Sequence, residues 1–117
     1  DEGRQHMACI WGGTGAPGGC NKEEVIAKHN QYLASIDHFT SAILANGVDV
    51  EISAHPFVDN AVQKLALCRE IFDGIPNPFV STTADVCRFM EMLRGRINRS
   101  LSNADAVVAE FQRRLKR

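Results

Sequence analysis

The stretch that decides the fold is "NGVDVEISAHPFVDN", residues 46–60. Gly47 is a typical residue just past the end of a helix, because glycine enters the left-handed backbone region without steric cost. Residues 48–53 then alternate apolar and polar side chains, which is the pattern of a strand with one buried face. Asp59 or Asn60 can cap a following helix. The stretch therefore predicts a helix, a strand and a second helix in direct succession.

The residues before this stretch predict a long helix that ends near Asn46. Asn21 can cap its first turn, in which Glu23 and Glu24 would lie where the helix dipole favours anions. Apolar positions recur at spacings of three and four, and they form one stripe. The stripe consists of Val25, His29, Tyr32, Ile36, Phe39 and Ile43. His29 lies within it, so we expect its side chain to be packed.

A strand is expected ahead of the long helix. Residues 6–11, "HMACIW", predict a buried strand, and the polar residues 1–5 predict a hairpin turn before it. The pairing partner of this strand would then precede Asp1. We therefore expect that the chain begins inside a hairpin and that the domain has a further N-terminal portion.

Three more helices are expected after the decisive stretch. The first would present Val62, Leu65, Cys68 and Phe72 on one face. After a turn-rich loop at 73–82, Thr82 caps the second, with a stripe of Val86, Phe89, Met90, Leu93 and Ile97. Ser102 is expected to cap the last, with Val107, Val108, Phe111 and Leu115. The order strand, helix, strand, helix, helix, helix defines a helix-rich α/β fold.

Composition and charge restrict the classes of partner. The chain has 117 residues, enough for one domain or part of one, with 44% hydrophobic and 23% charged residues, as in soluble globular proteins. No apolar run approaches the length of a membrane span, so no membrane partner is expected. Residues 61–117 carry 10 basic and 6 acidic side chains, against 3 and 8 in residues 1–60. Without interleaved aromatic residues, this excess predicts a solvated helix face and no nucleic-acid partner.

The four cysteines provide no metal-binding pattern. No C-x-x-C pair occurs, which argues against a zinc ribbon. Cys9 and Cys68 lie in apolar patterns and are expected to pack in the core. A Cys68–Cys87 disulfide stays open, and so does the compartment, cytoplasmic or periplasmic and secreted.

The loop before the long helix contains a literal G-x-G-x-x-G match, "GTGAPG" at 13–18. A dinucleotide site needs the helix to start inside this motif, so that its N–H groups face the phosphates. Here Pro17 lies inside it and the helix is delayed to Asn21. The acidic candidates Asp49 and Glu51 lie more than 30 residues beyond the motif and alternate outward along a strand. Nucleotide binding is therefore the weaker interpretation of the loop.

His55 is the residue best placed to hold a metal ion. It follows the tip of the predicted strand, and Pro56 stiffens the exit. Neutral imidazole is a common zinc ligand, but zinc needs three or four ligands. His29 and His38, nine residues apart on one helix, cannot complete the same site. Taken alone, His55 is therefore one ligand and not a metal site.

Three segments together resemble a known family. They are "DEGRQHMACIWGGTGAPGG", the helix ending "ANGVDVEISAHPFVDN", and "IPNPFVSTTADVCRFMEML". This order is similar to the C-terminal part of metallo-β-lactamase-fold hydrolases, nearest the B3-like branch. Residues 1–99 would be the C-terminal portion of such an αββα sandwich, contributing two strands, and 100–117 an additional C-terminal helix. The partner of this portion would be the N-terminal half of the same domain.

The resemblance implies a zinc cofactor and a substrate pocket. His55 matches the family's last metal-binding histidine, which serves the second of two zinc ions. Gly13, Thr14 and Gly15 match the pocket loop, and Phe57 and Asp59 are candidates for the pocket rim. Where B3 β-lactamases often carry serines that hold the drug's carboxylate, this loop has glycines, so a β-lactam is not the only small-molecule substrate to consider. Lactones, esters and thioesters are further candidate substrates, because they are hydrolysed by the same class of reaction.

The family's H-x-H-x-D-H motif does not occur in the 117 residues, and the resemblance places it upstream. In the whole enzyme, two zinc ions would generate a hydroxide that attacks a carbonyl, and the metals would take up the oxyanion charge. No catalytic residue is expected within these residues, and the segment alone would be inactive. The alternative is a non-catalytic interaction or dimerisation module of the same half-fold. The oligomeric state stays open.

Overall fold

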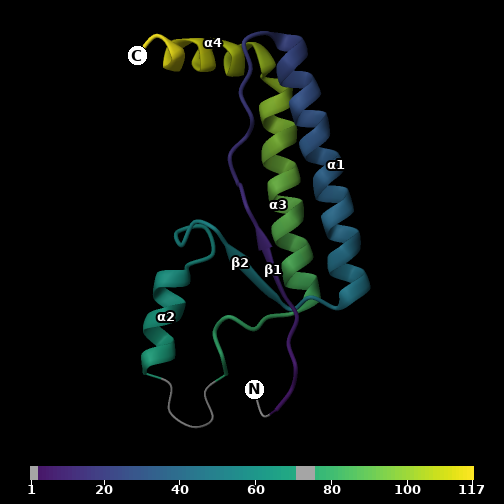
Figure 1. Ribbon diagram of the computed structural model, residues 1–117, viewed down its shortest axis with the longest axis vertical. Coiled ribbons are helices and arrows are strands. Elements are labelled where there is room, and N and C mark those ends of the chain that lie inside the picture. Colours follow the sequence, from purple (N-terminus) through teal and green to yellow (C-terminus); the bar gives the residue numbers. More distant parts are fainter. Residues whose placement is uncertain (1–2, 71–75) are drawn as a thin grey trace. The chain divides into compact units, whose positions relative to one another are not determined.

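The computed structural model describes residues 3–70 and 76–117 and has a mixed, helix-rich α/β fold with two parallel strands (Figure 1). The predicted fold class is confirmed at this level. In chain order the elements are β1 (Ala8–Trp11), α1 (Lys22–Asn46), β2 (Val50–Ser53), α2 (Ala61–Arg69), α3 (Thr83–Ser102) and α4 (Ala104–Leu115). They form two compact units. The sheet unit comprises residues 1–14 and 41–89, and the helix unit comprises residues 15–40 and 90–117.

The sheet of the sheet unit is a parallel pair, with Ala8 opposite Val50 and Trp11 opposite Ser53. The structure gives β1 a partner that the sequence did not indicate, since β1 pairs with β2 along one edge, and a further partner upstream of Asp1 stays a prediction. The prediction of a buried strand at 6–11 is wrong in detail. β1 is shorter, and Ile10 is 62% exposed. A short run of apolar residues predicts a buried strand, but the run itself does not show whether other elements cover both of its faces.

Helix α1 begins and ends where the sequence places its ends. The Asn21 side chain accepts a hydrogen bond from the backbone N–H of Glu24 at 2.8 Å, and the Glu24 carboxylate accepts one from the Cys20 N–H at 2.7 Å. This reciprocal cap satisfies amides that the helix leaves unpaired. Gly47 has φ +59°, the left-handed conformation expected just past a helix. Both predicted ends are therefore confirmed.

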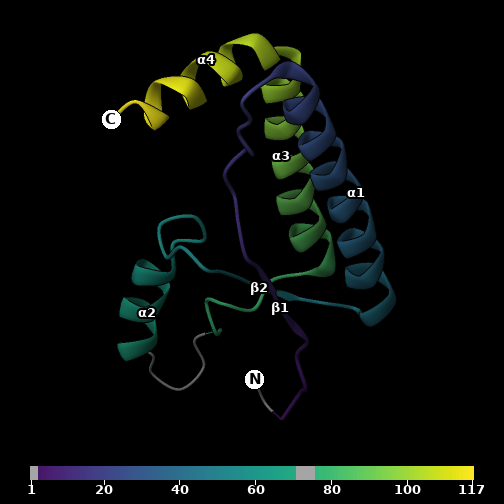
Figure 2. The same ribbon diagram turned by 45° about the horizontal axis from the view of Figure 1, so that its top comes forward.

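In the helix unit, α1 and α3 lie side by side (Figures 1 and 2). An ion pair joins Asp37 on α1 to Arg94 on α3, which also pairs with Glu91. The predicted stripes supply the interior. The buried side chains of this unit are Val25, His29, Ile36, Met90, Leu93, Ile97 and Ala104.

Helix α4 follows α3 almost directly. It begins at Ala104 with Asn103 at the cap position, so Ser102 is not its cap. Ser102 is the last residue of α3, and its hydroxyl donates to the Arg99 carbonyl at 2.8 Å. The serine was mistaken for a cap because the same hydroxyl can also bond back into the preceding turn. The expected additional C-terminal helix is present, with its start four residues later than residue 100.

Helices α2 and α3 differ in how well their ends and faces were predicted. Thr82 caps α3 as expected, since its Oγ1 accepts from the Asp85 N–H at 3.1 Å and the Asp85 carboxylate accepts from the Thr82 N–H. In α2, however, the expected apolar face is exposed, with Val62 at 61% and Leu65 at 55%. Spacing identifies such a face but not whether anything covers it. Phe72, expected on this face, lies outside the described residues.

Close packing explains one glycine of the loop before α1. A Cβ built on Gly18 would lie 2.4 Å from a ring carbon of Phe111. The Phe111 ring of α4 therefore rests directly on the backbone of residue 18, and only glycine leaves room for it. The Lys28 ammonium also donates to the Gly18 carbonyl at 3.1 Å.

The replacement Gly18→Ala is expected to destabilise the helix unit by about 1–3 kcal/mol, because the added methyl displaces the Phe111 ring. Gly15→Ala is the matched control, since a Cβ there meets nothing within 4 Å. Urea unfolding of the two variants measures the difference. Equal stability of the two variants would contradict the packing described for Phe111.

Candidate functional site

The predicted site residues gather at one edge of the sheet. Because β1 and β2 run parallel and Trp11 pairs with Ser53, the chain leaves both strands at the same edge. Residues 12–14 emerge from β1 there, and residues 54–55 emerge from β2. Ligands of α/β proteins commonly bind outside the carboxyl ends of parallel strands. The pairing therefore brings the glycine loop and His55 to a location suited to a binding site.

His55 is exposed at this edge, on a turn that fixes its backbone. The Val58 N–H donates to the His55 carbonyl at 2.9 Å, and the His55 N–H donates to Ser53 Oγ at 3.1 Å. Its imidazole stacks on the ring of Phe57, with centroids 5.6 Å apart and planes at 20°. Phe57 itself is 79% exposed. The result is an accessible imidazole on a restrained backbone, with an aromatic side chain beside it.

Asp59 lies in the interior and connects the end of β2 to the start of α2. Its two carboxylate oxygens accept hydrogen bonds from the Ser53 N–H at 2.8 Å and the Ala61 N–H at 3.0 Å. The Ala61 N–H also donates to the Pro56 carbonyl at 2.9 Å, so it is shared between two acceptors. The structure thus places Asp59 as the anchor of the turn that carries His55. Asn60, next to it, has φ +56° and makes no side-chain cap.

The three loop positions differ in accessibility. Thr14 is buried, whereas a Cβ built on Gly13 or Gly15 would meet nothing within 4 Å. The glycines therefore leave open space at their positions and are not required there by close packing. In the same loop, the Cys20 and Glu24 amides are already bonded by side chains of the chain itself. A phosphate at this helix start would have to displace those bonds, which weakens the nucleotide interpretation.

Within the described ranges 3–70 and 76–117, no group of three or more His, Cys, Asp or Glu side chains is arranged to hold a metal ion. His55 is thus a single zinc ligand that would require others.

The four cysteines are free thiols. Part of the cationic charge of the C-terminal helices is paired, since Arg113 and Arg114 both contact Glu110, and Arg88 contacts Asp85.

A second cluster, which sequence reasoning missed, surrounds Glu51 in the sheet unit. A cavity of about 190 Å³ is lined by Glu51, Lys64, Phe79, Ser81, Asp85, Val86 and Phe89. The Lys64 ammonium lies 5.4 Å from the centre of the Phe79 ring, a cation–π contact. Among the described residues, Glu51 Oε1 is buried without a hydrogen-bond partner. Strand alternation predicts that Glu51 points outward, and it gives no sign that Lys64, Phe79 and Phe89 line a cavity with it.

Burial raises the pKa of Glu51, the charge of Asp59 raises it further, and Lys64 acts in the opposite direction. Burial also raises the pKa of the Cys9 thiol, with a smaller contribution from Glu51, its register partner in the sheet. A carboxyl group that favours its neutral form in a cavity is a common property of functional sites, although structural carboxyl groups can share it.

The second missed contact joins the start of β1 to β2. Asp49 accepts from His6 Nδ1 at 2.6 Å and from the Met7 N–H at 3.0 Å. The bond from His6 is the main reason that the pKa of Asp49 is lowered. The register of the sheet explains this contact. Because Ala8 pairs with Val50, the residues just before β1 and just before β2 lie next to each other, and these include His6 and Asp49.

The replacement Glu51→Gln is expected to raise stability at pH 7, by under about 1 kcal/mol, since the cavity is partly open to solvent. A carboxyl group with a raised pKa in the folded state costs stability as the pH rises through that pKa. The advantage of the variant should therefore disappear as the pH falls to about 3, about one unit below the ordinary glutamate pKa of about 4.3, where Glu51 is largely neutral in both states.

Urea midpoints at the two pH values test this, with the exposed Glu70→Gln as the matched control. A gain for Glu51→Gln that is equal at both pH values would contradict the assignment of a desolvated carboxyl group.

Comparisons with known proteins do not assign a family. No protein-family model, curated protein or solved structure matches the chain. Among the residues described, no helix combines the length and apolar character that crossing a bilayer requires. The family resemblance in the sequence accordingly stays a prediction.

Proposed function

We propose that the chain is the C-terminal part of a zinc-dependent hydrolase with the metallo-β-lactamase fold, acting on a β-lactam, lactone, ester or thioester. Its role is to complete the substrate pocket and to supply His55 as a ligand of the second zinc ion. The observation that supports this most directly is the parallel pairing of β1 with β2, since it brings the loop at 12–14 and His55 to one sheet edge. In the proposal, residues 1–99 complete the sandwich and 100–117 extend it.

The chemistry of His55 fits one position of a zinc site. Its imidazole is exposed, its backbone is held by two hydrogen bonds, and Asp59 anchors the turn from inside. A restrained backbone orients a ligand and lowers the entropy lost on metal binding. The zinc ions would supply Lewis acidity to a bound substrate. Phe57, stacked beside the imidazole, would form an apolar rim for the substrate.

The open sheet also supports an N-terminal partner half. Parallel sheets occur almost only with both faces covered, and two strands alone are marginal in stability. Here Ile10 of β1 is largely exposed. In the proposal, the N-terminal half of the same domain covers this face and brings the remaining zinc ligands.

The test uses the longer protein that contains this chain. His55→Ala is expected to lower bound zinc from about two ions per molecule to about one and to reduce hydrolysis by about 10²-fold or more, as loss of a metal ligand does. His38→Ala is the control, because His38 lies within α1 in the helix unit and is not predicted to bind zinc. The 117-residue chain alone is expected to bind no zinc tightly. Zinc content is measured by elemental analysis.

Unchanged zinc content in His55→Ala would refute the role of this residue. Absence of the H-x-H-x-D-H motif upstream would refute the whole assignment.

The second candidate function is a non-catalytic dimerisation module. The exposed apolar side chains of the sheet unit favour it, since Ile10, Phe57, Val62 and Leu65 are all accessible. This function predicts a dimer in which Ile10→Lys weakens association at least about tenfold, because a charge would be desolvated at the interface. Met92→Lys is the control, because Met92 is an exposed apolar position in the helix unit.

Analytical ultracentrifugation measures the association state of the chain and so tests the second candidate function. A monomer across the micromolar range, or equal effects of the two substitutions, would exclude dimerisation through this face.

A further inference from the structure

The helix unit contains a serine–histidine pair that the zinc site does not use. His29 of α1 is fully buried, and its Nε2 atom lies 2.9 Å from the hydroxyl oxygen of Ser100 on α3. Its Nδ1 atom lies 2.7 Å from the carbonyl oxygen of Val25. The two residues are 71 positions apart in sequence, so the packing of α1 against α3 brings them together.

The hydrogen bonds determine the tautomer of His29. A carbonyl oxygen can only accept, so Nδ1 must carry the hydrogen and donate it to Val25. Nε2 of the neutral ring is then the acceptor, and the Ser100 hydroxyl donates to it. A serine hydroxyl bonded to a histidine whose other nitrogen is oriented by an acceptor is the arrangement of an activated nucleophile.

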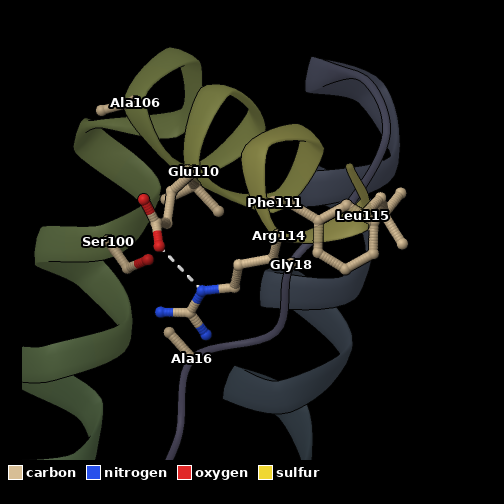
Figure 3. A pocket seen from close by; sticks show the side chains of 9 residues that line it. Ala16, Gly18, Ser100, Ala106, Glu110, Phe111, Arg114 and Leu115 are labelled. Carbon is tan, nitrogen blue, oxygen red and sulfur yellow. Dashed lines mark hydrogen bonds and ion pairs between the residues drawn. The ribbon is translucent and has the colours of Figure 1, made fainter. Parts of the chain in front are cut away.

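Ser100 also lines a cavity, shown in Figure 3. The cavity has a volume of about 530 Å³, within the range of small-molecule sites. Most of its wall is apolar, and the polar groups are few. The lining residues are Ala16, Gly18, Ser100, Ala106, Val107, Glu110, Phe111, Arg114 and Leu115. The hydroxyl that contacts His29 thus belongs to a residue that a ligand in the cavity would touch.

Arg114 supplies a positive charge to the same cavity. Its Nε donates to the Glu110 carboxylate at 2.8 Å, so the terminal nitrogens of the guanidinium keep donors for a further acceptor (Figure 3). The paired arginines lower the pKa of Glu110, with Arg114 making the largest contribution, so this carboxylate is ionised at neutral pH. A carbonyl oxygen that gains negative charge in the cavity would lie near a cation.

We propose that Ser100 and His29 form a nucleophile–base pair that cleaves esters of apolar acyl groups bound in this cavity. Ser100 Oγ forms a bond to the ester carbonyl carbon while its proton moves to His29 Nε2. The bond from that carbon to the alcohol oxygen then breaks, and the alcohol leaves with the proton from His29. Water hydrolyses the resulting acyl-serine by the same steps, which releases the acid and restores both residues.

The pair is tested in the purified protein with p-nitrophenyl butanoate and with an alkyl fluorophosphonate, which phosphonylates an activated serine and releases fluoride. We expect one phosphonyl group per chain, on the peptide that contains Ser100, and ester cleavage that persists in EDTA. EDTA resistance separates this chemistry from the zinc-dependent reaction proposed above. Ser100→Ala removes the nucleophile, so we expect it to abolish the phosphonyl label at this position and to lower ester cleavage by at least about 10²-fold.

Ser102→Ala is the matched control, because Ser102 lies one half-turn away on α3 and bonds to the Arg99 carbonyl. Its rates should equal those of the unmodified protein. Urea-unfolded protein keeps Ser100 but loses the pair, so it should not be labelled, and this comparison needs no variant. Circular dichroism verifies that each variant is folded. The proposal is overturned if folded protein is not labelled on Ser100, or if Ser100→Ala and Ser102→Ala behave alike.

Discussion

The parallel pairing of β1 with β2 is the constraint on which the arrangement of the candidate site depends. Parallel neighbours cannot be joined by a tight turn, so the chain between them must cross over, and here α1 makes that crossing. The same pairing places the carboxyl ends of both strands at one edge. An antiparallel pair would have put residues 12–14 and His55 at opposite ends of the sheet.

Sequence reasoning succeeded where the determining interaction is local. Asn21 and Thr82 were identified as caps because a cap bonds to amides two or three residues away, and the stripes of α1 and α3 follow from helical periodicity. Ser102 shows the limit of this reasoning, because one hydroxyl can serve the helix before it or the helix after it. The partner of β1 was missed for a different reason, since strand pairing joins residues about 40 positions apart.

The residues of the candidate site also fall into two groups, those that the local sequence predicts and those that depend on distant contacts. The position of His55 at a strand tip could be read from the strand pattern and Pro56, whereas the expected side-chain cap of α2 is not formed, because Asn60 occupies the cap position without such a bond. The Glu51 cavity and the contact between His6 and Asp49 could not, because each depends on which distant residues fold over or beside the strand. Alternation along β2 gives the direction of a side chain, but burial requires knowledge of what lies in that direction.

His29 is the clearest case in which periodicity and chemistry carry different information. Its place in the apolar stripe of α1 predicts burial correctly, and burial by itself argues for a packing role. An apolar side chain would pack there without the cost of desolvating two ring nitrogens. The hydrogen bonds that His29 donates to Val25 and accepts from Ser100 offset that cost, but an apolar pair of similar shape can contribute as much stability. The stability of the fold therefore does not require a histidine at this position, whereas the proton transfer that we propose for Ser100 does.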